Sequence, residues 1–106
     1  AVEVVAKDDA VFLRNNVIEC TIQPQIGRMM QLSFVGGENM LWIDPKAEEN
    51  APGKFSWKNY GGLKIWLWPQ NDWRKIYGKG WPPPKEMDIG PYSFALSSNN
   101  SYLRVL

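Results

Sequence analysis

Turn-forming residues interrupt this chain at short intervals. Nine glycines and eight prolines are spread through its 106 residues. No stretch of about a dozen residues places apolar side chains at the i, i+3, i+4, i+7 spacing of an amphipathic helix. The pieces between turns either alternate apolar with polar side chains or are apolar throughout, which is typical of strands. The sequence therefore predicts an all-β fold.

The clearest pair of expected strands lies in the first third of the chain. Residues 17–23 and residues 28–35 both alternate apolar and polar side chains, and the turn between them predicts a hairpin. In regular alternation, Arg28 would share a face with the apolar side chains of its strand. Cys20, the single cysteine, alternates with isoleucines and is interpreted as a core residue rather than a nucleophile. The other expected strands are residues 1–6, 10–13, 40–43, 63–68, 92–97 and 101–106, and the expected loops are 44–54 and 69–86.

The charge balance excludes several classes of partner. Twelve basic and eleven acidic residues give a formal net charge of +1, so the chain has no overall field that would attract nucleic acid or an anionic membrane. Its apolar runs are far shorter than the roughly 20 residues of a membrane-spanning helix. The absence of histidine removes the commonest general base and the commonest metal ligand. We therefore expect no cofactor, no metal site, no nucleic acid and no membrane partner.

Tryptophan is concentrated in one segment. Residues 57–81 hold five of the six tryptophans, mixed with Asn, Gln, Asp, Lys and paired glycines. Flat indole faces beside amide and charged groups are typical of a site that holds a sugar ring, and packing in a core is the alternative. Residues 63–68 are expected to form a strand that is covered on both faces. Lys64, Trp66 and Trp68 would share one of them, where sheet-to-sheet packing is favoured for the two indoles.

Two segments carry an ordered set of motifs. The first is N-N-V-I-E-C-T-I-Q-P-Q-I-G-R at residues 15–28, followed by G-E-N-M-L-W at 37–42. The second is W-K-N-Y-G-G-L-K-I-W-L-W-P-Q at residues 57–70, followed by W-P-P at 81–83. Together they resemble the N-terminal part of the galactose mutarotase-like β-sandwich proteins, and most closely the uncharacterised DUF4380-type group.

The resemblance implies an antiparallel β-sandwich, a supersandwich of two large sheets with a carbohydrate on its concave face. Complete members are well over twice this length. Residues 1–106 would then be the N-terminal portion of such a domain, either incomplete or completed by another chain, and the alternative is a single β-sandwich domain. The histidines that mutarotases use have no counterpart in this chain, so no epimerase mechanism is carried over.

Seven residues are candidates for contact with a ligand. A charge directed toward a core face needs a partner or a ligand, so Arg28 is a candidate for ligand contact; the alternative is a strand-end arginine in a salt bridge or in solvent. Lys64 and Trp66 share a strand face, and a lysine is rarely buried unless it is paired. Asn59 and Tyr60 precede a glycine pair that allows a tight turn beside a cleft. The full set is Arg28, Asn59, Tyr60, Lys64, Trp66, Gln70 and Trp81.

The last two candidates lie in the expected loop, and long loops in small domains often carry function. Gln70 follows the end of the expected strand, and Trp81 precedes three prolines that would hold it at the rim of a pocket. Asp72, Glu86 and Asp88 are the acidic residues nearest to this loop. Paired carboxylates act on glycosidic bonds only at a defined separation, so catalytic residues remain unassigned.

The residues and the resemblance together favour carbohydrate binding. One alternative is a sugar-active enzyme, an epimerase, lyase or hydrolase, whose catalytic residues lie outside this chain. Another is a structural or interaction module without a ligand, in which the edge of the last expected strand, residues 101–106, self-associates or pairs with another chain. A periplasmic or secreted location is favoured, although a single cysteine does not fix the redox compartment.

Overall fold

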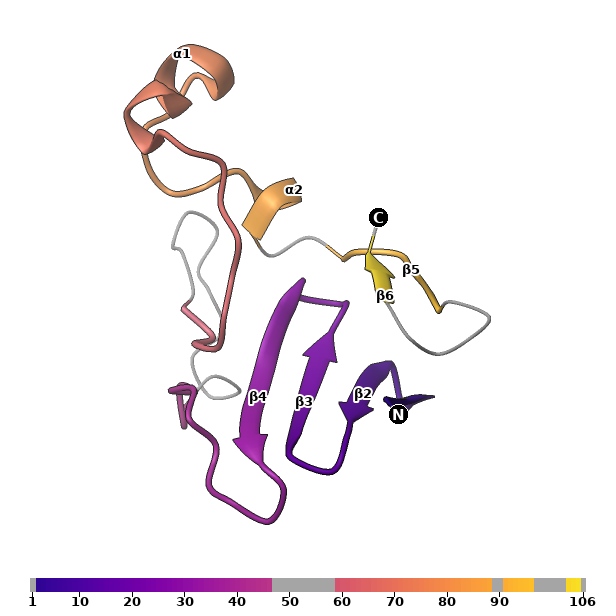
Figure 1. Ribbon diagram of the computed structural model, residues 1–106. Coiled ribbons are helices and arrows are strands. Elements are labelled where there is room, and N and C mark those ends of the chain that lie inside the picture. The colour runs from indigo at the N-terminus through magenta and orange to yellow at the C-terminus, as the bar shows by residue number, and fades with distance from the viewer. Residues whose placement is uncertain (1, 47–58, 89–90, 97–102, 106) are drawn as a thin grey trace.

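The computed structural model describes residues 2–46, 59–88, 91–96 and 103–105. Over these residues the chain is rich in strands, and four of them form an antiparallel sheet in the order β1-β2-β3-β4 (Figure 1). A second sheet pairs β5 with β6. The all-β prediction is confirmed at this coarse level. The elements are β1 (Glu3–Lys7), β2 (Ala10–Arg14), β3 (Ile18–Gln23), β4 (Arg28–Phe34), η1 (Gln70–Asp72), α1 (Trp73–Tyr77), α2 (Lys85–Asp88), β5 (Phe94–Leu96) and β6 (Leu103–Val105).

Short polar side chains form the first two turns of the large sheet. Asp8 and Asp9 have φ angles of 52° and 62° and make the two-residue loop between β1 and β2. Aspartate tolerates this left-handed region better than most residues, which suits it to a tight hairpin. Between β2 and β3, Asn15 Oδ1 accepts hydrogen bonds of 2.8 Å from backbone N–H groups two and three residues further on. The strands expected at residues 1–6, 10–13 and 17–23 correspond to β1, β2 and β3.

A bulge changes the face that Arg28 occupies. The register between β3 and β4 shifts between Thr21 and Ile22, and Arg28 lies opposite Gln23. Opposed residues in an antiparallel pair share a face, and an extra residue in one strand reverses its alternation. Arg28 is therefore out of phase with Leu32. The prediction that it shares the apolar face of its strand is wrong for this reason.

Irregular segments cover the outer edge of β4. The side chain of Asn39 makes hydrogen bonds that a neighbouring strand would otherwise make. Its Oδ1 accepts from the N–H of Leu32 at 3.1 Å, and its Nδ2 donates to the carbonyl of Met30 at 2.9 Å. Nearer the start of β4, Met29 and Leu63 exchange backbone hydrogen bonds of 3.1 and 2.8 Å. Gly62 permits this approach, because its φ is 72° and a Cβ there would overlap the Met29 carbonyl oxygen. The segment that follows Gly62 is thereby anchored to the sheet.

Several expectations about the middle of the chain are wrong. Neither of the strands expected at residues 40–43 and 63–68 is present. The first segment has one isolated bridge, between Ile43 and Gly61, and the second has one between Leu63 and Met29. Residues 63–68 are not covered on both faces, because Ile65 is 85% and Trp68 is 91% exposed. The expected loop 69–86 contains η1, α1 and the start of α2. Helices this short present no amphipathic stripe that sequence inspection can detect.

The buried core of the described residues is small. Val11, Met30 and Trp73 are their buried apolar side chains apart from proline, and Cys20 is only half-buried. The accessible surface of 7814 Å² exceeds the value of about 6,100 Å² for a compact monomer of this mass. The radius of gyration of 15.5 Å likewise exceeds the value of about 13 Å for a compact domain of this length. Much apolar surface therefore faces solvent.

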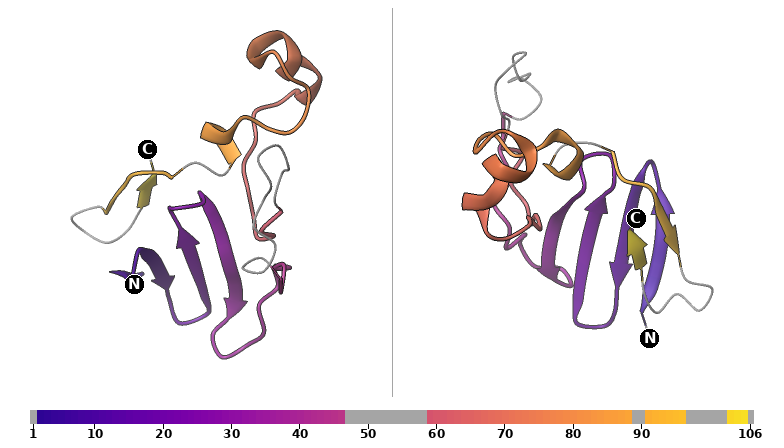
Figure 2. Two further views of the ribbon diagram at one scale, coloured as in Figure 1. Left: turned by 180° about the vertical axis from the view of Figure 1, so that it is seen from behind. Right: turned by 90° about the horizontal axis from the view of Figure 1, so that it is seen from above.

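The smaller elements lie toward opposite edges of the four-stranded sheet. The views in Figures 1 and 2 place the β5–β6 hairpin on the β1–β2 side and the helices beyond the β4 side. The extended segment 62–68 runs from the edge of β4 toward η1 and α1. None of the helices in the described part of the chain is long and apolar enough to cross a membrane.

Candidate functional site

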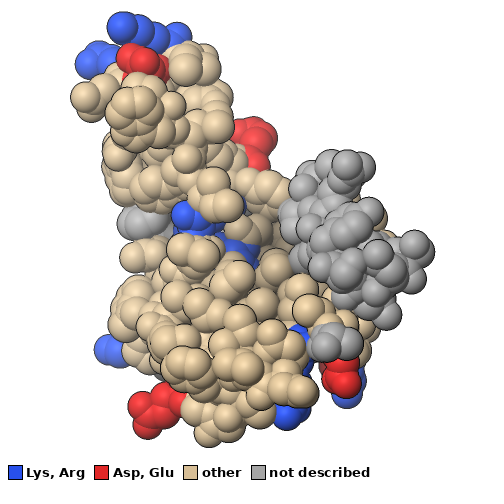
Figure 3. Space-filling view, in the orientation of Figure 1, with Lys and Arg blue, Asp and Glu red and all other residues tan. Residues whose placement is uncertain are grey.

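A cavity of about 500 Å³ lies where the β3–β4 turn, the extended segment 63–67 and residues near α2 come together. Small-molecule sites in proteins are commonly about 300–1,000 Å³ in volume and mostly apolar, with a few polar groups. Figure 3 shows basic atoms in a hollow in the middle of one face, with uncharged atoms around them. The lining includes Arg28, Lys64, Trp66 and Tyr92, together with aliphatic side chains such as Met29 and Leu67.

An ion pair between Arg28 and Asp88 lies behind the cavity wall. Arg28 Nη2 donates to Asp88 Oδ1 at 2.9 Å, and the two side chains are 3% and 0% exposed. Arg28 Nη1 donates to the carbonyl of Gly61 at 3.0 Å, so the guanidinium also holds the glycine pair in place. Burial of one charge without the other would be costly, and the pair offsets this cost. The salt-bridge alternative for Arg28 is therefore confirmed, and the same side chain also lines the cavity.

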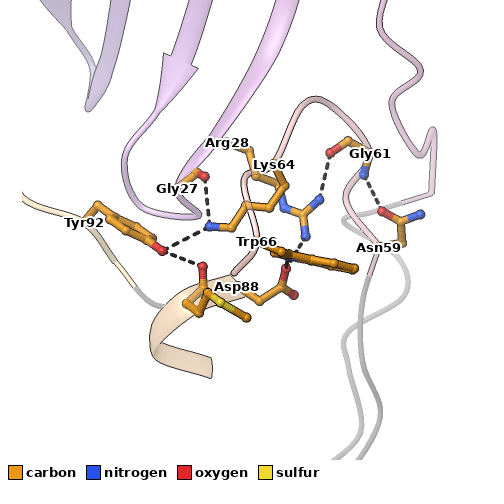
Figure 4. A network of polar contacts seen from close by, with 9 residues as sticks. Gly27, Arg28, Asn59, Gly61, Lys64, Trp66, Asp88 and Tyr92 are labelled. Atoms are coloured by element: carbon orange, nitrogen blue, oxygen red, sulfur yellow. Dashed lines mark hydrogen bonds and ion pairs between the residues drawn. The ribbon is translucent and has the colours of Figure 1, made fainter. Parts of the chain in front are cut away.

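Trp66 joins the same carboxylate from the extended segment. Its Nε1–H donates to Asp88 Oδ1 at 2.9 Å, as Figure 4 shows. The indole also makes edge-to-face contacts with Trp73 and Trp81, with centroids 5.4 and 6.0 Å apart. Trp73 in turn donates its Nε1–H to the carbonyl of Leu67 at 2.9 Å. Trp66 is thus fixed at the cavity by a charge-assisted hydrogen bond and by two aromatic contacts.

Lys64 and Tyr92 form the polar group on the other side of the cavity. Lys64 Nζ donates to the carbonyl of Gly27 at 3.0 Å and to the Tyr92 hydroxyl at 3.3 Å. The same ammonium lies 4.5 Å from the centroid of the Tyr92 ring. The Tyr92 hydroxyl donates to the carbonyl of Met87. Gly27 leaves the space that the Tyr92 ring occupies, since a Cβ there would overlap the ring.

Burial shifts two pKa values at this site. Desolvation lowers the pKa of Lys64 below its ordinary 10.5; the negative charge of Asp88 opposes this shift and the positive charge of Arg28 adds to it. Desolvation raises the pKa of Tyr92 above its ordinary 10.0, and the Asp88 charge acts in the same direction. Both shifts favour the uncharged form of the group and have the same main cause.

The structure brings three of the predicted residues to the cavity, namely Arg28, Lys64 and Trp66. The other four are not among its lining residues. Asn59 is exposed and accepts a hydrogen bond of 3.0 Å from the N–H of Gly61, so it shapes the glycine turn. Tyr60 is half-buried, with its ring centroid 5.8 Å from Arg28 Cζ. Gln70 is exposed at the start of η1, and Trp81 is half-exposed against Trp66.

Neither Trp66 nor Trp68 packs between two sheets, contrary to what the sequence had led us to expect. Trp68 is 91% exposed. Trp66 is half-buried between the cavity and the other tryptophans. Because residues 63–68 leave β4 after a single bridge, no second sheet is stacked on this face within the described residues.

Asp88 and Tyr92 belong to the site, but the sequence did not select either of them as a candidate for ligand contact. Arg28 gave one signal, since a buried arginine requires an anion. The candidates for that anion were spread along the chain, and nothing local selects Asp88. Glu86 is exposed whereas Asp88 is engaged by Arg28 and Trp66, so these two acids have different environments. Among the described residues, no group of three or more Cys, Asp or Glu side chains is placed to hold a metal ion.

Comparison of the chain with protein-family models, with curated proteins and with solved structures finds no match.

Proposed function

We propose that this protein binds a carbohydrate in the cavity between the β3–β4 turn and the segment 63–67. The proposal includes the finer fold, an antiparallel β-sandwich of mutarotase-like type. The observation that carries it is the lining of the cavity, in which an indole, a phenol and two cationic side chains surround a volume of about 500 Å³. The apolar C–H faces of a sugar ring pack on aromatic rings, and hydroxyl groups accept hydrogen bonds from Lys and Arg.

The rigidity of the aromatic wall supports this proposal. Trp66 is held by Asp88 and by neighbouring indoles, and Tyr92 is held by Lys64 and by the Met87 carbonyl. A wall fixed before the ligand arrives loses little side-chain entropy on binding. The cavity is also mostly aliphatic and aromatic, which favours a ligand with one well-defined apolar face.

Titration with a panel of monosaccharides and disaccharides, followed by tryptophan fluorescence and calorimetry, tests the proposal. Trp66→Leu is expected to abolish binding, and circular dichroism checks that this variant is folded. Trp68→Leu is the matched control, since this indole is 91% exposed and is not among the lining residues. Absence of binding to every sugar, or equal loss of binding in both variants, would contradict the proposal.

An interaction module is the second candidate, and the exposed apolar surface favours it. Ile65, Trp68 and Trp42 are 85%, 91% and 61% exposed and lie on segments near the outer edge of β4. Where such side chains join into one contiguous apolar surface, that surface often marks a site of protein association. Light scattering over a range of concentrations tests this candidate, and a monomer at all concentrations would argue against self-association.

A further inference from the structure

The charges that the described residues place around the cavity do not balance. Arg28 and Lys64 line it, and no acidic residue does so among the described residues. Asp88, the partner of Arg28, is 0% exposed behind the wall. Two cations and one carboxylate leave one net positive charge. Because the carboxylate is wholly covered and Lys64 is only partly buried, the side of this cluster nearer to solvent is positive (Figure 3).

The cations also hold hydrogen-bond donors that the described residues do not use. An ammonium has three N–H donors, and Lys64 directs two contacts, to Gly27 and Tyr92. Arg28 Nε is buried without a hydrogen-bond partner among the described residues. Buried donors in proteins are nearly always paired. The remaining N–H donor of Lys64, which is only partly buried, is the one that an acceptor in the cavity can reach.

We propose that the ligand of this cavity is an acidic sugar, a monosaccharide unit that carries one carboxylate, and that Lys64 is the cation that contacts the carboxylate. One carboxylate matches the single net positive charge, whereas a phosphate with two negative charges exceeds it. A carboxylate also has only acceptor groups, as the unused donors require. The inference rests on the proposed function, because it names the class of sugar for the same site.

The placement of the rings fits the remainder of such a ligand. Trp66 and Tyr92 line the same cavity as the two cations, and Lys64 Nζ lies 4.5 Å from the Tyr92 ring centroid. A carboxylate bound to Lys64 therefore carries its ring next to an aromatic wall. The charge contact then distinguishes acidic sugars from neutral ones.

Three matched ligands test the inference: galacturonate, galactose and the methyl ester of galacturonate. The ester keeps the shape at the carboxyl carbon and removes the charge. At about pH 6.5, where the acid is ionised, we expect galacturonate to bind about tenfold tighter than either neutral ligand at low salt. The preference should fall as salt is raised, since ions screen a partly exposed charge pair. Benzoate serves as a carboxylate without a sugar ring.

Variants of Lys64 localise the effect. Lys64→Gln should remove the preference for the acid, and Lys64→Arg should keep most of it because the charge remains. Lys75→Gln is the control, since it removes the same charge from α1, where the Lys75 side chain is 83% exposed. Urea unfolding of each variant shows whether a loss of binding reflects loss of the fold.

The possible outcomes separate the two proposals. Equal affinity for galactose, ester and acid would overturn the inference and leave carbohydrate binding intact. Binding of benzoate without any sugar would overturn carbohydrate binding and with it the acidic sugar. A tenfold preference that survives Lys64→Gln in a folded variant would overturn the role of Lys64. A preference lost in Lys64→Gln and kept in Lys75→Gln supports the inference.

Discussion

Arg28 and Asp88, which are 60 residues apart in the sequence, form an ion pair of 2.9 Å in which neither side chain is more than 3% exposed. Asp88 Oδ1 also accepts from Trp66. One carboxylate oxygen therefore connects β4, the extended segment and α2. Removal of the Asp88 carboxylate would therefore break contacts to β4 and to the extended segment together.

Substitutions in this pair should be strongly destabilising. Asp88→Asn and Arg28→Met each leave one group buried without its charge partner, and we expect each to lower the free energy of unfolding by about 3–5 kcal/mol. The double variant Arg28→Met with Asp88→Asn should lose less than the sum of the two single losses, because no unpaired charge remains. Urea unfolding measures all three. Asp72→Asn is the control, because its partner Lys75 is exposed, and a similar loss there would contradict the argument.

Two glycines with similar backbone angles should respond differently to alanine. Gly62 and Gly36 have φ of 72° and 76°, so alanine costs about 1 kcal/mol at either position from the left-handed conformation alone. A Cβ at Gly62 would also overlap the Met29 carbonyl, whereas nothing lies within 4 Å at Gly36. Gly62→Ala should therefore lose a further 1–3 kcal/mol, about the cost of overpacking. Equal unfolding midpoints for the two variants would show that the Gly62 segment is not held against β4.

Stability at alkaline pH should depend on Tyr92. Its pKa is raised in the folded state, so its contribution to stability is complete below its ordinary pKa of 10.0 and is lost as the pH rises through the higher, folded value. Lys64, with a lowered pKa, acts in the opposite direction below 10.5. Tyr92→Phe should therefore show a shallower loss of stability above about pH 10 than the unsubstituted protein. Unfolding midpoints from pH 7 to about 11 test this, with Tyr77→Phe on α1 as control; identical slopes in all three proteins would contradict it.

The thiol of Cys20 should react slowly in the folded protein. Burial raises its pKa above the ordinary 9.0, and the thiolate is the reactive form. Alkylation near pH 8 should be slower in buffer than in denaturing urea, after correction with a small thiol under the same conditions. A folded protein that reacts at the rate of the unfolded chain would indicate that β3 opens readily or that the thiol faces solvent.

The sheet was predictable because its information is local. The turns at Asp8–Asp9 and at Asn15 are determined by adjacent residues, and alternation marks the strands beside them. The bulge was not predictable, since the one extra residue, Met30 of β4 opposite the step from Thr21 to Ile22, leaves no mark in the pattern. This single shift moved Arg28 to the other face.

The site was predictable only in part for a similar reason. Lys64 and Trp66 stood out because lysine and tryptophan together are unusual in a short apolar segment. Gln70 and Trp81 were selected by their nearness in sequence, but the chain turns into η1 and α1 after residue 69 and carries them away from the lining. Asp88 required knowledge of a contact over 60 residues, which a single sequence does not contain.

The contrast between neighbouring strands and the distant ion pair determines the expected order of folding. Each of β1 to β4 pairs with its neighbour in sequence. Contact between Arg28 and Asp88 requires closure of a long loop, and the entropy of that closure is lost before the ion pair stabilises the chain. We expect the sheet to form early in refolding and the cavity to form last. Asp88→Asn should then accelerate unfolding and leave the refolding rate almost unchanged, as stopped-flow tryptophan fluorescence would show. A newly made chain would accordingly acquire its strands before it acquires any ability to hold a ligand.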